Sequence, residues 1–123
     1  MTTILLVEDT LDTAELARRA LTSQGYEFLH APDAESGLAL ARERLPDLIL
    51  LDLGLPDYDG QTLAGWLRDV PALAKTPIIA FTAWPHETAQ NMVASYGCNG
   101  YIPKPIVKVS EFIAQVEFFL KSA

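Results

Sequence analysis

The sequence predicts an α/β fold, a doubly wound sheet of five parallel strands in the flavodoxin-like (βα)5 order 2-1-3-4-5. Short apolar runs alternate with stretches of helical periodicity along the chain. The central runs are continuously apolar, as expected for parallel strands covered on both faces. Right-handed crossover connections place helices on both sides of such a sheet. We expect the strands at residues 4–7, 26–29, 48–51, 78–81 and 101–102.

Four apolar stripes with helical spacing lie between these runs or after the last one. Asp33 stands where a helix N-cap is expected, and Gly25 and Gly97 stand where helices are expected to stop. Prolines at positions 46, 71 and 77 mark breaks before new elements. The stripes consist of Ala14, Ala17 and Leu21; of Ala34, Leu38, Ala41 and Leu45; of Leu63, Leu67 and Val70; and of Val109, Phe112, Ile113, Val116 and Leu120.

Length and composition restrict the class of protein. A chain of 123 residues suits one domain with its own core, so we expect a single domain over residues 1–123. The net charge of -7 disfavours direct contact with nucleic acid, whose phosphates attract lysine and arginine. No apolar run is long enough for a bilayer, and the first residues do not resemble a signal sequence, so we expect a cytoplasmic location. Cys98 is the only cysteine and suits a small buried apolar group without chemistry.

Polar side chains follow four of the five apolar runs: Glu8 and Asp9, then Asp52, Thr82 and Lys104. In the order 2-1-3-4-5 the first and third strands are neighbours, so Asp9 is expected beside Asp52, with Thr82 and Lys104 approaching from the next two strands. Three carboxylates repel one another unless a cation lies among them. A hydroxyl and an ammonium beside them suit the oxygens of a phosphoryl group. This set of residues indicates that Asp52 accepts phosphate.

Each of these residues except Lys104 has an ordinary structural explanation when it is taken alone; a solvated charge poorly explains a lysine fixed between two prolines. Asp52 suits a turn or a cap, and Glu8 with Asp9 suits the N-terminus of the first helix. Thr82 suits a strand by its β propensity. Their arrangement at successive strand ends favours the phosphoryl site.

Four segments resemble the receiver domain of two-component response regulators, typified by the single-domain chemotaxis regulator: ILLVEDT, PDLILLDLGLPDYDG, PIIAFTA and GCNGYIPKPI. The resemblance covers the whole chain. It implies that Asp52 is the phosphoacceptor and that Thr82 and Lys104 contact the phosphoryl group. It also implies that Glu8 and Asp9 form the acidic pair for Mg²⁺ or Mn²⁺.

Mg²⁺ prefers octahedral oxygen ligands and keeps several waters. We therefore expect the carboxylates of Asp9 and Asp52 and the backbone carbonyl of Gly54 to bind the ion, with Glu8 acting through water. The resemblance further implies a cis peptide bond between Lys104 and Pro105.

The resemblance implies a switch, in which phosphorylation draws Thr82 inward and the ring of Tyr101 enters the vacated space. The changed surface would lie on the fourth helix, the fifth strand and the fifth helix. At least one of Phe118 and Phe119 should face outward, because other residues already form the apolar stripe of the fifth helix. The candidate partner surface consists of Trp84, His86, Tyr101 and Phe118.

Two residues depart from the commonest family pattern. Trp84, two residues beyond Thr82, is unusually bulky, whereas Gly54, two residues beyond Asp52, is unusually small. We hypothesise that Trp84 governs either dephosphorylation or partner docking.

The preferred interpretation is a signalling phosphoprotein without separate substrate turnover. It would take its phosphoryl group from a histidine kinase or a histidine phosphotransfer protein and signal to a downstream protein, as a monomer or a phosphorylation-dependent dimer. A receiver excised from a hybrid histidine kinase or a transcription factor is the first alternative. A Mg²⁺-dependent aspartyl-phosphate phosphatase would need a second aspartate at position 54, which is glycine. A flavodoxin-like FMN protein would need a phosphate-binding loop where the acidic residues 8–12 stand.

Overall fold

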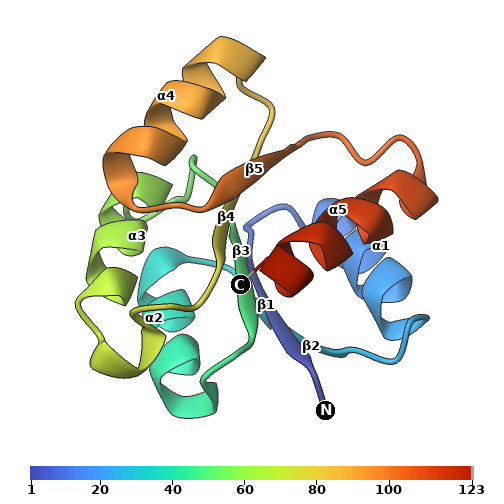
Figure 1. The fold of residues 1–123 in the computed structure, drawn as a ribbon, viewed down its shortest axis with the longest axis horizontal. Helices are drawn as coiled ribbons and strands as arrows, with labels where there is room; N and C mark the ends of the chain where they lie inside the picture. Colours follow the sequence, from blue (N-terminus) through green and yellow to red (C-terminus); the bar gives the residue numbers. More distant parts are fainter. Residues whose placement is uncertain (123) are drawn as a thin grey trace.

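The computed structural model describes residues 1–122 and contains the expected sheet of five parallel strands (Figure 1). The strand order is β2-β1-β3-β4-β5, which confirms the predicted flavodoxin-like fold. Within the described residues, no helix combines the length and apolarity needed to cross a membrane. The elements in chain order are β1 (Thr3–Val7), α1 (Leu11–Thr22), β2 (Glu27–Ala31), α2 (Ala34–Arg44), β3 (Leu48–Leu51), α3 (Gly60–Arg68), the 3-10 turn η1 (Pro71–Leu73), β4 (Ile78–Thr82), α4 (His86–Tyr96), β5 (Gly100–Pro103) and α5 (Val109–Ser122).

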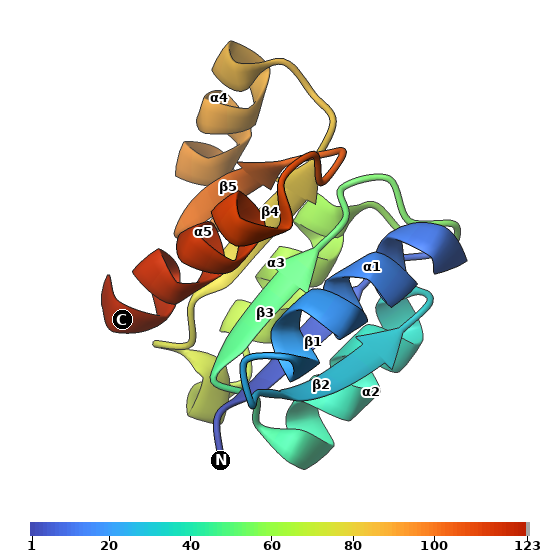
Figure 2. The ribbon, with the colours of Figure 1, turned by 90° about the vertical axis from the view of Figure 1, so that its right-hand side faces the viewer.

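The helices form two layers, one on each face of the sheet (Figures 1 and 2). Ile4 and Leu6 of β1 belong to the core beneath α1 and α5. Leu5 and Val7 belong to the opposite core, which contains the buried faces of α2 and α3. Every residue of β1, β3 and β4 is buried, because both sides of these strands are covered. This burial explains why the central strands are apolar without alternation.

The helix boundaries confirm two of the predicted caps. Asp33 is the N-cap of α2, and its carboxylate accepts a hydrogen bond from the Ser36 backbone N–H at 2.8 Å. Gly97 ends α4 in the left-handed conformation at φ 79°, a region that favours glycine. Gly25, at φ 86°, lies in the turn that follows α1.

Two members of the predicted apolar stripes are not in the core. The prediction for Leu45 is wrong: it is 50% exposed, because α2 ends at Arg44 and Leu45 turns the chain with φ 46°. The prediction for Val109 is also wrong, because this residue begins α5 and is 41% exposed. Val70 lies beyond the end of α3 but still packs, partly buried, against the core beneath α2 and α3.

Cys98 packs against the core beneath α2 and α3, where it is partly buried, whereas the sequence suggested a buried thiol. Burial raises the pKa of the thiol to about 11, with a smaller opposing effect of the Arg68 charge. Because the thiolate is the reactive form, alkylation by iodoacetamide at pH 8 should be on the order of a hundredfold slower in the folded chain than in denaturant. Mass spectrometry of timed samples measures both rates. Equal rates would show that the folded chain does not hold the thiol protonated.

Candidate functional site

The three predicted acidic residues meet at the carboxyl ends of two central strands, β1 and β3. Leu51 of β3 lies beside Val7 of β1 in the sheet, so the residues that follow these two strands start from adjacent positions. One carboxylate oxygen from each of Glu8, Asp9 and Asp52 lies within 4.8 Å of the other two. The proximity of Asp9 to Asp52 that the strand order predicted is therefore present.

Lys104 provides the positive charge beside this acidic cluster. Its Nζ atom lies 2.8 Å from Glu8 Oε1 and 3.4 Å from Asp52 Oδ1, and its side chain is only 16% exposed. The backbone N–H of Lys104 donates to the Thr82 carbonyl at 2.8 Å, which ties this residue to the end of β4. The peptide bond to Pro105 is cis, as the sequence resemblance implied.

Glu8 is the most enclosed of the three acids, with 0% of its surface exposed. Burial raises the pKa of its carboxyl, and the nearby Asp52 acts in the same direction, whereas Lys104 opposes them. The backbone at Glu8 is fixed to β2: its N–H donates to Ala31, and its carbonyl accepts from His30 Nε2 at 2.7 Å. Thr10, not Glu8 or Asp9, is the N-cap residue of α1. The position of Glu8 thus fits an ionic site better than a helix cap.

The donor set suits a small divalent cation. Three carboxylates carry more negative charge than one lysine balances, and hard oxygen donors are what Mg²⁺ and Mn²⁺ prefer. Asp9 is exposed, so the cluster is open to solvent on one side. Gly54 is also exposed, and a Cβ atom at this position would have no neighbouring atom within 4 Å. The residues present therefore fit the metal that the sequence resemblance implied.

Comparison with known proteins identifies the family of the chain. The family described as the response regulator receiver domain matches residues 4–117. The chain is 36% identical over 120 residues to the polar-differentiation response regulators DivK of Brucella anthropi and Brucella abortus, covering 98% of this chain and 97% of each relative. The chain belongs to the response regulator receiver domain family.

Solved receiver structures show the same fold. A putative response regulator from Chloroflexus aurantiacus has a TM-score of 0.90 and 32% identity, with 98% of each chain covered. The receiver domain of a sensor histidine kinase from Pseudomonas aeruginosa, solved with a magnesium ion coordinated in its active site cleft, has a TM-score of 0.87 and 28% identity over 98% of each chain.

Thr82, for which the sequence resemblance implied the switch hydroxyl, is the last residue of β4. Its side chain is buried, and Oγ1 accepts a hydrogen bond from the Trp84 backbone N–H at 3.0 Å. A hydroxyl that accepts in this way still has its own hydrogen to donate.

Tyr101, the second predicted switch residue, is partly buried on β5. Its hydroxyl forms a hydrogen bond with Nδ1 of His86, the first residue of α4, and the two ring centroids lie 5.4 Å apart. The hydroxyl is therefore held at the start of α4.

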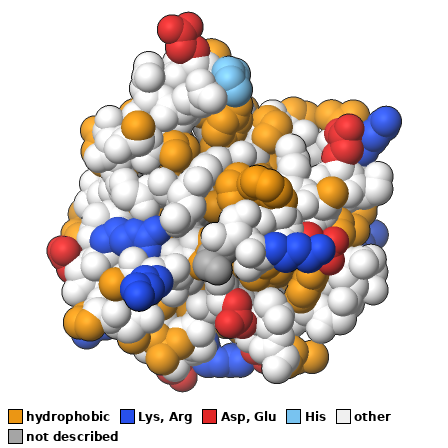
Figure 3. All heavy atoms as spheres, viewed as in Figure 1, with side chains coloured by type: hydrophobic (Ala, Val, Ile, Leu, Met, Phe, Trp, Pro, Cys, Tyr) orange, Lys and Arg blue, Asp and Glu red, His pale blue; other side chains and the backbone are white. Residues whose placement is uncertain are grey.

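The receiver face that carries α4, β5 and α5 presents several aromatic residues. Phe118 is 64% exposed, whereas Phe119 is partly buried, so one of this pair does face outward as predicted. Trp84 is 37% exposed and His86 is exposed. Figure 3 shows hydrophobic side chains on this face between α4 and α5, with few charges among them.

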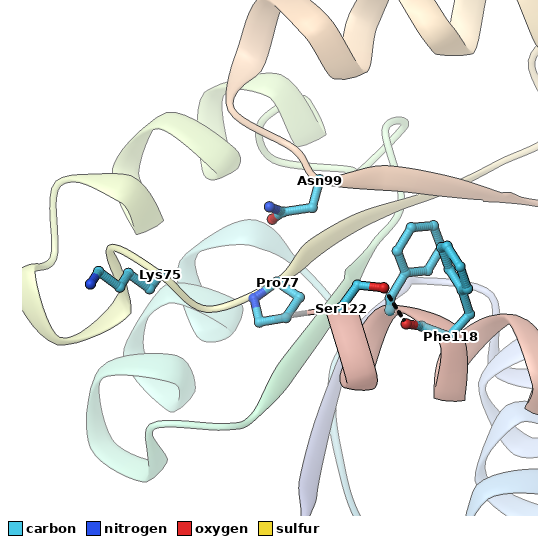
Figure 4. Close-up of a pocket in the computed structure, with 6 residues that line it drawn as sticks. Lys75, Pro77, Asn99, Phe118 and Ser122 are labelled. Atoms are coloured by element: carbon cyan, nitrogen blue, oxygen red, sulfur yellow. Dashed lines mark hydrogen bonds between the residues drawn. The ribbon is translucent and has the colours of Figure 1, made fainter.

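A hollow on this side of the molecule lies away from the acidic cluster. Its lining comes from the amino ends of β4 and β5 and from the end of α5, where Ser122 Oγ donates to the Phe118 carbonyl at 2.8 Å (Figure 4). Among the described residues that line it, Phe118 is the only predicted site residue. The lining residues are Lys75, Pro77, Asn99, Phe118, Phe119 and Ser122.

Two residues shape the loop after Asp52, and sequence reasoning identified only one of them, Gly60, as a turn residue. Gly60 packs so closely that a Cβ atom there would lie 2.5 Å from the Asp52 carbonyl oxygen. The carboxylate of Asp57 hydrogen-bonds to the first turn of α2. Both residues stand in the segment PDYDG, whose composition is typical of a turn, and neither contact has a signal in the local sequence.

Proposed function

We propose that this receiver domain is a phosphoacceptor in a two-component or phosphorelay system, and that Asp52 receives the phosphoryl group. One observation carries the proposal: Asp52 lies next to two further carboxylates and within 3.4 Å of the Lys104 ammonium. The family match supports it, because two-component signalling is the role of receiver domains. We take residues 1–123 as one domain and the cytoplasm as its location.

In the proposed reaction, a carboxylate oxygen of Asp52 attacks the phosphorus of a phosphohistidine from a histidine kinase or a histidine phosphotransfer protein. A bond forms between this oxygen and phosphorus, and the phosphorus–nitrogen bond breaks with its electron pair passing to the imidazole. Asp9, Asp52 and the Gly54 carbonyl would hold Mg²⁺, with Glu8 acting through water, and the ion would supply charge neutralisation. Lys104 and Thr82 each contact a phosphoryl oxygen and hold the group in place.

The proposed output is a rearrangement of Thr82 and Tyr101. Thr82 would turn towards the phosphoryl group, and the Tyr101 ring would move inward and leave His86. This movement would change the surface formed by Trp84, His86, Tyr101 and Phe118, on which a downstream protein docks. Such a protein signals by its own state, with no separate substrate turned over.

Phosphorylation of the purified chain tests the proposal. Incubation with Mg²⁺ and a small donor such as acetyl phosphate should add one phosphoryl group to the wild-type chain and none to Asp52→Asn. Intact mass spectrometry detects the adduct, and the fluorescence of Trp84 and Trp66 reports the conformational response. Phosphate on another residue, or an unmodified wild-type chain, would contradict the assignment of Asp52.

A further inference from the structure

The loop between β3 and α3 (residues 53–59) follows Asp52 directly and contains Gly54, the proposed source of the carbonyl ligand. Two hydrogen bonds fix its two ends. The Gly54 N–H donates to Asp52 Oδ1 at 3.1 Å, and the Gly60 N–H donates to the Leu53 carbonyl at 3.1 Å. The middle of the loop lies at the surface, with Asp57 among its exposed residues. The geometry of the metal site therefore depends on what holds this middle part.

Asp57 holds the middle of the loop by accepting hydrogen bonds from helix α2. Its Oδ1 atom accepts from the Ala34 N–H at 2.8 Å, and its Oδ2 atom accepts from the Glu35 N–H at 3.0 Å. These donors belong to the first two residues of α2, more than twenty positions away in the sequence. The Tyr58 N–H also donates to Oδ1, at 3.0 Å. Both carboxylate oxygens are thus engaged, and the loop is bonded to α2 at two points.

Asp57 and Asp33 accept hydrogen bonds from different backbone N–H groups at the N-terminus of α2. Asp33, the ordinary N-cap, accepts from the N–H and the hydroxyl of Ser36, and leaves the donors at Ala34 and Glu35 for Asp57. The positive end of the helix dipole also favours a carboxylate there. Desolvation acts in the opposite direction, but the backbone donors lower the pKa of Asp57, so its side chain is anionic at neutral pH. An anion shared between a loop and a helix end acts as a tether.

We propose that Asp57 is a positioning residue for the metal site: its hydrogen bonds to Ala34 and Glu35 hold the β3–α3 loop so that the Gly54 carbonyl and the Asp52 carboxylate stay aligned. This inference rests on the proposed function. Outer residues that orient metal ligands commonly change metal affinity by about ten- to a hundredfold when they are replaced. Asp57 contacts none of the proposed ligands with its side chain, so its effect passes through the backbone of the loop.

Calorimetric titration with MgCl₂ alone tests the tether. Asp57→Ala should weaken Mg²⁺ binding about tenfold. Asp57→Asn keeps one acceptor oxygen and should give an intermediate affinity. Asp33→Ala is the matched control, because it removes a carboxylate from the same helix end but leaves the loop bonded to α2. This control should bind Mg²⁺ as the wild type does. Urea unfolding without metal checks that the two alanine variants are folded and lose comparable stability.

Hydrogen exchange without metal gives a second readout. The backbone amides of residues 54–58, apart from Pro56, should exchange faster in Asp57→Ala than in the wild type, and Asp33→Ala should leave them unchanged. Unaltered Mg²⁺ affinity of Asp57→Ala, or equal weakening in both alanine variants, would overturn the tether while leaving the proposed function intact. A wild-type chain that binds no Mg²⁺ would overturn the metal site itself, and the positioning role with it.

Discussion

Gly60→Ala is expected to destabilise the fold by about 3 kcal/mol, because the added methyl group has no space. A Cβ atom at this position would lie 2.5 Å from the Asp52 carbonyl oxygen and 2.7 Å from the Leu53 Cα atom. Both are backbone atoms of the two residues that follow β3, so no side-chain rotation relieves the overlap. Either α3 must move away from the sheet, or the segment that carries Asp52 must shift. Urea unfolding of the metal-free chain measures the loss.

Gly65→Ala provides a matched control in the same helix. Gly65 is exposed, and a Cβ atom there would meet nothing within 4 Å. Because alanine favours the helical backbone more than glycine does, this change should stabilise the chain by about 0.5–1 kcal/mol. The two substitutions are chemically identical and should have opposite signs. Equal stabilities of the two variants would show that the close approach of α3 to Asp52 does not matter.

The contrast between these glycines shows what the sequence could predict and what it could not. The alternation of apolar runs with helical stripes predicted a doubly wound sheet and made 2-1-3-4-5 the obvious candidate order, because parallel strands with crossover helices allow few topologies. That order predicted Asp9, Asp52 and Lys104 at one edge of the sheet, and the structure places them there. Gly60 follows Asp59 in a turn segment and Gly65 lies inside a helical stretch, but only the path of the loop shows that a side chain at position 60 has no space.

The sequence did not predict most contacts between segments that are distant along the chain. Arg68 has the appearance of a solvated charge at the end of α3, yet its guanidinium donates to the carbonyls of Leu73, Thr76 and Gly97 and to the Asn99 side chain. Like Asp57, it binds backbone atoms of other segments, and backbone donors and acceptors leave no pattern in the sequence. Leu45 shows an error of the other kind, a predicted core position that the structure does not contain: the helical spacing continues one residue past the true end of α2.

Lys104→Met is expected to destabilise the metal-free chain by about 3 kcal/mol at neutral pH, because removing one partner of a buried ion pair leaves the other charge buried and unpaired. The Lys104 ammonium lies 2.8 Å from a Glu8 carboxylate that has no exposed surface. Methionine keeps much of the length of the side chain but not the charge, so Glu8 and Asp52 would face each other without a cation. Lys108→Met is the control, because Lys108 is exposed nearby and should change stability by less than about 0.5 kcal/mol.

The dependence of this loss on pH and on metal identifies its cause. Burial already raises the pKa of Glu8, and removal of the lysine takes away the group that opposes this shift. A carboxyl with a raised pKa favours the folded state when it is protonated, so the deficit of Lys104→Met should shrink as the pH falls and be largest above neutrality. Mg²⁺ should stabilise the variant more than the wild type, because the ion replaces the missing charge. Urea unfolding at two pH values, with EDTA or with Mg²⁺, measures both effects. A loss of unfolding free energy that depends on neither pH nor Mg²⁺ would show that Lys104 stabilises the chain by packing and not by its charge.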